Sequence, residues 1–70
     1  MLDTVVAVHI AEMTKRLVKA AEIAKAADAC ASAGSVDAAV DVSMDIEQLI
    51  YEATTLLNAA SLVRRIGSST

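Results

Sequence analysis

The sequence has no Trp, Phe or Pro, a single Tyr, a single Cys and only two Gly among its 70 residues. Because Pro is absent and Gly occurs only at positions 34 and 67, nothing interrupts a long helix in either half of the chain. One cysteine excludes an internal disulfide, and no Cys/His cluster has the spacing of a zinc site. The composition therefore predicts an all-α protein that is held together by neither disulfides nor a metal.

A chain this short has little interior, so a single core gives it little stability. When disulfides and metals are excluded, burial against a second copy or a partner is the usual remaining source of stability. The hydrophobic content of 56% agrees, because two solvated amphipathic helices do not need so much apolar surface. We therefore expect an oligomer.

The charge balance excludes several classes of partner. The net charge is −3, and the basic residues are dispersed, whereas nucleic acids are bound by concentrated Lys and Arg. The apolar stretch at 5–11 is short, Asp3 precedes it in place of a basic cluster, and Lys15 and Arg16 interrupt the next apolar run. We expect neither a signal peptide nor a membrane span. The lone thiol favours a reducing compartment, so we expect a cytoplasmic protein.

Residues 32–35, Ser-Ala-Gly-Ser, lie at the middle of the chain between two long apolar-periodic segments. Gly34 can adopt the left-handed conformation that ends a helix, and Ser35 can cap the next helix. This pattern predicts a single domain over 1–70 that folds as an antiparallel two-helix hairpin. We predict helix one at about 3–33, the turn at about 33–35, helix two at about 36–66 with Gly67 as its stop, and a frayed tail at 67–70.

Each predicted helix carries one row of apolar residues, here called its seam, at alternating spacings of three and four. The predicted helix-one seam is Val6, Ile10, Met13, Leu17, Ala20, Ala24, Ala27 and Ala31. The predicted helix-two seam is Ala39, Val42, Ile46, Leu49, Ala53, Leu56, Ala60 and Val63. Folding at Gly34 sets large residues of one seam against small residues of the other, and it brings Arg16 to the level of Glu52.

Several apolar residues remain after both seams are assigned, and a monomeric hairpin exposes them. We expect these residues to form an interface between hairpins, which assemble as a homodimer in a four-helix bundle. The predicted interface residues are Val5, Ile23, Ile50, Leu57, Met44 and Tyr51. Cys30 also lies beside the helix-one seam.

The sequence presents no constellation of catalytic, cofactor-binding or metal-binding residues. His9 and Glu12 are three apart, but di-metal sites in bundles use Glu-x-x-His with acids on the seams, and here the order is reversed. Cys30 has neither a base nor a basic cluster near it, so we interpret it as a small apolar filler. There is no Gly-rich phosphate loop and no nucleophile elbow. We therefore expect neither an enzyme nor a bound cofactor or metal.

The function that this pattern favours is a small, non-enzymatic helical module that self-associates and binds or scaffolds other proteins. Two alternatives stay open. A dimeric hairpin with His9 on its first helix has the general shape of the dimerisation and phosphotransfer unit of sensor kinases, although Ile10 stands where such units generally carry an acid. The other alternative is a secreted or filament-forming helical hairpin, whose apolar flank joins it to its neighbours.

Overall fold

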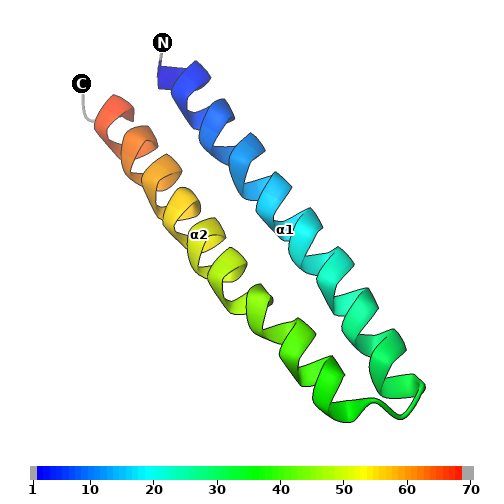
Figure 1. The fold of residues 1–70 in the computed structure, drawn as a ribbon. Helices are drawn as coiled ribbons and strands as arrows, with labels where there is room; N and C mark the ends of the chain where they lie inside the picture. The colour runs from blue at the N-terminus through cyan, green and yellow to red at the C-terminus, as the bar shows by residue number, and fades with distance from the viewer. Residues whose placement is uncertain (1, 69–70) are drawn as a thin grey trace.

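The computed structural model describes residues 2–68 and contains two helices, α1 (Leu2–Ser32) and α2 (Val36–Ser68). The helices lie side by side in opposite directions and are joined by a tight turn, so both ends of the chain are at the same end of the molecule (Figure 1). The predicted all-α, antiparallel two-helix hairpin is confirmed.

The turn is closed by backbone hydrogen bonds at the end of α1. The Gly34 N–H donates to the Ala31 carbonyl at 3.0 Å, and the Ser35 N–H donates to the Cys30 carbonyl at 2.9 Å. These two bonds form a Schellman motif, which satisfies carbonyls that the helix end leaves without partners. The motif needs a left-handed residue at its corner, and Gly34 supplies it with φ at +88°. The Ser35 carbonyl then accepts the first bond of α2 from the Ala39 N–H at 2.9 Å.

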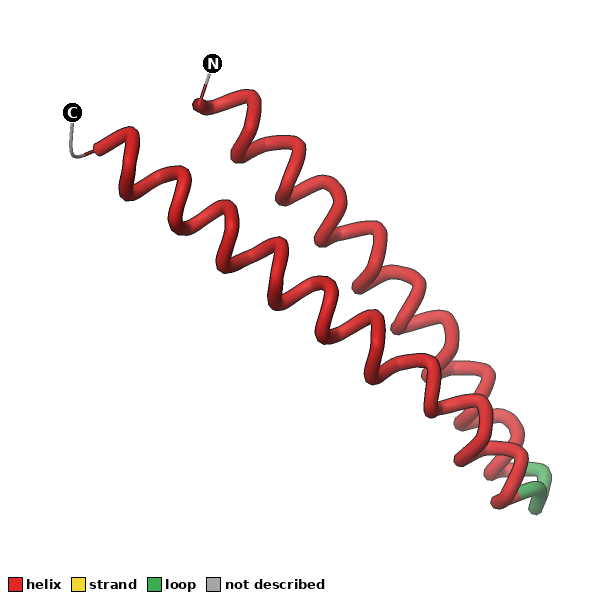
Figure 2. The backbone as a smooth tube through the Cα atoms, turned by 60° about the vertical axis from the view of Figure 1, so that its left-hand side comes forward, coloured by secondary structure: helices red, strands yellow, loops and turns green. Residues whose placement is uncertain are grey.

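The hairpin is a rod that measures 56 × 14 × 11 Å, and its two helices run side by side from the turn to the open end (Figure 2). Its radius of gyration is 16.2 Å, whereas a compact domain of 70 residues has one of about 11 Å. The fold is therefore a single two-helix layer, and each helix is covered on one side only.

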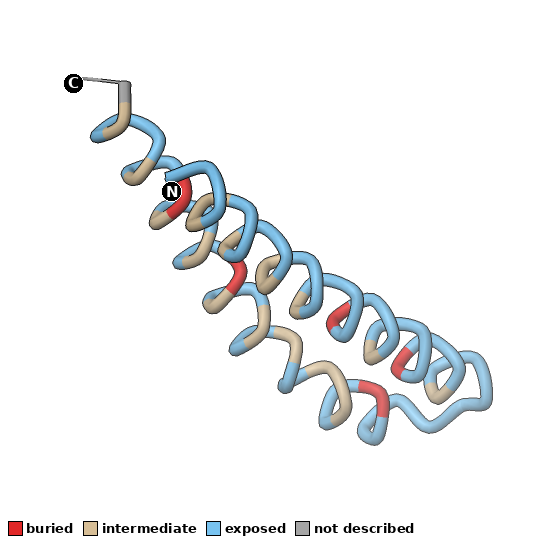
Figure 3. The backbone as a smooth tube through the Cα atoms, turned by 90° about the horizontal axis from the view of Figure 1, so that it is seen from above, coloured by how far each residue is buried: buried red, intermediate tan, exposed pale blue. Residues whose placement is uncertain are grey.

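The interior of this layer consists of alanines. Five side chains are buried between the helices: Ala20, Ala27, Ala39, Ala53 and Ala60. Among the described residues no large side chain is fully buried, and Figure 3 shows short buried segments within largely exposed helices. Alanine lets two helices approach closely, but each methyl group contributes little hydrophobic stabilisation.

The α2 seam is confirmed at every predicted position. Three of its alanines are buried, and the larger residues between them are half-buried. This agreement follows from the sequence itself, since α2 has only one row of apolar residues in which spacings of three and four alternate strictly from one end of the helix to the other.

The predicted α1 seam is wrong at every second position. Ile10 and Leu17 are 45% and 42% exposed, and Ala24 and Ala31 are exposed too. The half-buried positions are instead one residue earlier in each case: His9, Arg16, Ile23 and Cys30. Rotating α1 in this way half-buries Ile23 and Cys30 in place of two alanines, and it allows Arg16 to reach α2.

Gly67 does not end α2, contrary to the prediction, because the helix continues through it to Ser68. A Cβ added at Gly67 would lie 2.7 Å from Cδ1 of Leu2, so the glycine leaves room for the end of this flexible side chain at the open end of the hairpin. Residues 69–70 of the predicted tail lie outside the described residues.

Candidate interaction surface

The two broad sides of the hairpin differ in chemistry. One side, here called the polar face, carries a hydrogen-bonded cluster of Glu12, Arg16, Gln48 and Glu52. Arg16 Nε donates to Glu52 Oε1 across the helices at 3.0 Å, while its Nη1 donates to Glu12 Oε2 at 3.0 Å. Gln48 Nε2 donates to the second oxygen of Glu52 at 3.0 Å. The predicted pairing of Arg16 with the Glu52 level is therefore confirmed, and it fixes the register between the helices.

This cluster changes the acidity of its members. Hydrogen bonds from Arg16 and then Lys15 lower the pKa of Glu12, and hydrogen bonds from Gln48 and then Arg16 lower the pKa of Glu52. The same carboxylates raise the pKa of the Arg16 guanidinium. These groups are exposed to water, so the cluster sets the register of the helices and adds little stability.

The opposite side, here called the apolar face, is formed by Ile10 and Leu17 of α1 together with Ile50 and Leu57 of α2. Ile10 and Leu57 line one groove between the helices, which reaches down to Met13. Leu17 and Ile50 lie one heptad further toward the turn on their helices, so they project from the same side. All four side chains are substantially exposed in the isolated hairpin.

The apolar face continues to the open end of the hairpin. A second open groove, lined mostly by apolar side chains, begins at Leu2 and shares Val6, Ile10 and Arg64 with the first. The apolar surface therefore extends from Ile50 almost to the chain ends. A continuous exposed apolar surface of this kind is uncommon on a monomeric protein, so it is the candidate interaction surface of this hairpin.

Polar side chains beside the apolar face are already hydrogen-bonded to their own helices. Thr14 Oγ1 donates to the Ile10 carbonyl at 2.9 Å, and Ser43 Oγ donates to the Ala39 carbonyl at 2.7 Å. Burying a hydroxyl that has a partner avoids the cost of an unsatisfied polar group. These two residues are therefore compatible with a dry interface.

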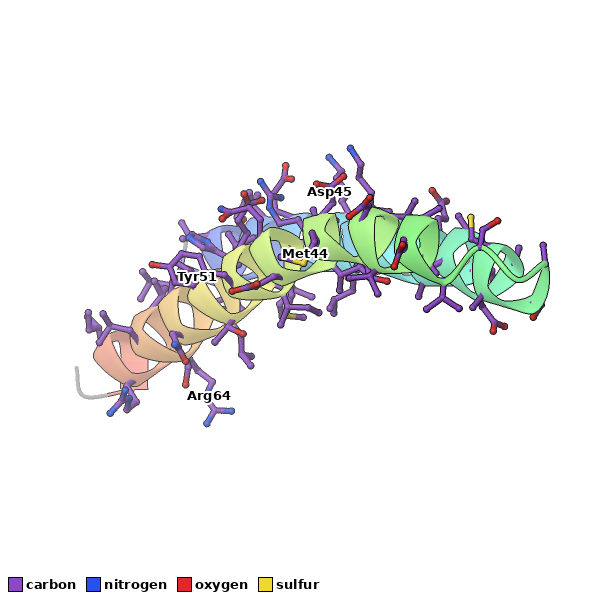
Figure 4. All side chains as sticks on the ribbon, turned by 60° about the horizontal axis from the view of Figure 1, so that its bottom comes forward. Met44, Asp45, Tyr51 and Arg64 are labelled. Atoms are coloured by element: carbon purple, nitrogen blue, oxygen red, sulfur yellow. The ribbon has the colours of Figure 1, made fainter. Side chains whose placement is uncertain are left out.

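The structure distributes the six predicted interface residues among three places. Ile50 and Leu57 lie on the apolar face. Val5 and Ile23 are half-buried within the hairpin itself. Met44 and Tyr51 lie together on the outer side of α2, where Tyr51 is 68% exposed. In Figure 4 they lie between Asp45, which projects to one side of the rod, and Arg64, which projects to the other.

Ile10 and Leu17 belong to the apolar face, whereas the sequence pattern predicted them in the α1 seam. Two rows one residue apart share Val6, Met13 and Ala20 and differ only in the positions between them. The signal that separates the rows is the reach of Arg16 toward Glu52, because this contact requires Arg16 to lie beside the seam.

His9 is half-buried, and its Nδ1 lies 2.8 Å from the Val5 carbonyl. Because a carbonyl only accepts hydrogen bonds, Nδ1 carries the proton in this contact. Glu12 is one turn away, but its carboxylate is bonded to Arg16 and Lys15. His9 therefore makes a local bond within α1, and the structure does not bring Glu12 to it as a catalytic or metal-binding partner.

Cys30 is a free, half-buried thiol near the turn. Within residues 2–68, no three His, Cys, Asp or Glu side chains come close enough together to form a metal site. Neither α1 nor α2, over the described residues, has an apolar stretch of the length and hydropathy needed to cross a bilayer. Comparison with known protein families, characterised proteins and solved structures found no match to this chain.

Proposed function

We propose that this protein is a non-enzymatic helical interaction module that self-associates through its apolar face. Two hairpins that meet through Ile10, Leu17, Ile50 and Leu57 form a four-helix bundle, and the polar face of each hairpin remains in water. The assembled bundle then presents the outer side of α2, including Met44 and Tyr51, to other proteins.

One observation carries this proposal: the hairpin buries alanines between its helices and leaves its larger apolar side chains on the outside. Its accessible surface is 5097 Å², whereas a compact monomer of its 7.2 kDa mass exposes about 4,100 Å². The excess is comparable with the roughly 800 Å² that each partner loses in a standard interface. A second copy on the apolar face removes this excess.

Light scattering coupled to gel filtration tests the proposal, and we expect twice the monomer mass at micromolar concentration. Leu57→Glu places a charge on the apolar face, so it should convert the dimer to monomer and reduce helicity together. A wild-type protein that is monodisperse, helical and monomeric would refute self-association.

Leu62→Glu is the matched control. Leu62 is 51% exposed and Leu57 is 52% exposed, so the two substitutions remove similar side chains from similar environments within one helix. Leu62 does not line either groove of the apolar face. The dimer should survive Leu62→Glu, and equal dissociation by both variants would show that the apolar face is not the interface.

A further inference from the structure

The charges of this protein are divided along the length of the rod. The half nearest the turn, residues 20–50, carries six carboxylates and one lysine. The half at the open end, residues 1–19 and 51–70, carries five basic side chains and three acids. One half is therefore strongly negative and the other is mildly positive.

We infer that the two hairpins of the dimer lie antiparallel, with the turn of each copy beside the open end of the other. This inference rests on the proposed self-association through the apolar face and adds its orientation. The antiparallel order sets each acidic half against a basic half, whereas the parallel order brings both acidic halves together. Like-charge juxtaposition of this kind disfavours the parallel dimer.

The twofold symmetry of the antiparallel dimer determines which helices meet. When two hairpins stack face to face and antiparallel, the twofold axis runs across the rod within the interface. Each helix then packs against its own copy, α1 on α1 and α2 on α2. With the axis at the centre of the apolar face, Leu57 of one copy covers Ile50 of the other, and Ile10 covers Leu17.

The distance between the two turns measures the orientation directly. A spin label at the turn, introduced as Ser35→Cys in a Cys30→Ser background, reports the distance between the two turns by pulsed EPR. Ser35 is exposed and contributes its backbone to the turn, so the label leaves the helix contacts intact. In the antiparallel dimer the labels lie at opposite ends of a rod whose long dimension is 56 Å. In a parallel dimer they lie within about 20 Å, two helix diameters.

The outcomes separate the two proposals. A dimer with widely separated turn labels supports the antiparallel arrangement. A dimer whose labels are close together overturns that arrangement and leaves self-association standing. Monomeric wild-type protein overturns self-association and the orientation with it.

Discussion

At the scale of single residues, Glu52 links the helices through Arg16, and this link depends on pH. The pKa of Glu52 is lower in the folded protein than in the unfolded chain, so its contribution to stability is present above the ordinary glutamate pKa of about 4.3. That contribution is lost as the pH falls through the lowered folded value. Glu52→Gln should therefore reduce stability at pH 7 and have a much smaller effect at pH 3.

Urea denaturation followed by circular dichroism at the two pH values measures this difference. Glu22→Gln is the control, because Glu22 is exposed and lines a shallow groove on the outer side of α1. The control should not reproduce the loss at pH 7. An effect of Glu52→Gln that is equal at pH 7 and pH 3 would rule out a contribution from the ionised carboxylate.

The buried alanines are the second feature at this scale. Ala53 is 5% exposed at the centre of the α2 seam, where the helices approach closely. Ala53→Leu should lower the free energy of unfolding by about 1–3 kcal/mol, because the larger side chain forces the helices apart. Ala11→Leu, at an exposed position of α1, should be nearly neutral. If a urea titration showed that Ala53→Leu stabilises the protein, this result would contradict a close approach of the two helices at Ala53.

His9 is expected to be replaceable. Its ring bonds to the Val5 carbonyl of its own helix, and glutamine can make a similar local contact. His9→Gln should keep the oligomeric state and change the free energy of unfolding by less than about 1 kcal/mol. Loss of a cellular phenotype with the assembly intact would instead favour a phosphotransfer role for His9.

At the scale of elements, the turn depends on the backbone of Gly34. Apart from Gly34 itself and its two chain neighbours, no residue has an atom within 4 Å of a Cβ built at this position, so a substitution there meets strain from the positive φ and no clash with the rest of the hairpin. Gly34→Val should destabilise the hairpin by about 1–2 kcal/mol or favour one continuous helix. Gly34→Asn should cost less, because Asn tolerates the left-handed conformation. Equal stability of the two variants by urea denaturation would contradict this explanation.

The helices and the turn could be predicted from the sequence because each depends on local signals: uninterrupted apolar periodicity and a central Gly34. The rotation of α1 could not be predicted, since the row that faces α2 includes His9 and Arg16, and a rule that looks for apolar residues at this spacing passes over it. Contacts between helices resolve that ambiguity, and Arg16 with Glu52 is the contact that does so. The sequence therefore predicts that Ile50 and Leu57 of α2 are exposed, as they are. It does not predict the exposure of Ile10 and Leu17, because its apolar pattern assigns both to the α1 seam.

The end of α2 shows a similar limit. Glycine after an apolar-periodic segment commonly marks a helix end, and this rule holds at Gly34. Gly67 is instead inside the helix, where it faces the end of the Leu2 side chain. A packing role and a capping role for glycine look alike in sequence, and only the neighbouring helix distinguishes them.

At the scale of the whole molecule, a rod with an alanine interior has little hydrophobic stabilisation of its own. We therefore expect the hairpin to gain much of its stability when the apolar faces of two copies meet. Folding and association are then linked, and the stability of the helices depends on protein concentration.

The most direct test of this claim is the thermal melting of the wild-type protein, followed by circular dichroism over a hundredfold range of concentration. A dimer that folds as it associates should melt at a progressively higher temperature as the concentration rises. Leu57→Glu should abolish the trend and Leu62→Glu should preserve it. A wild-type melting temperature that stays constant across the whole range, with full helicity at the lowest concentration, would contradict the claim that the apolar face stabilises this protein by binding a second copy.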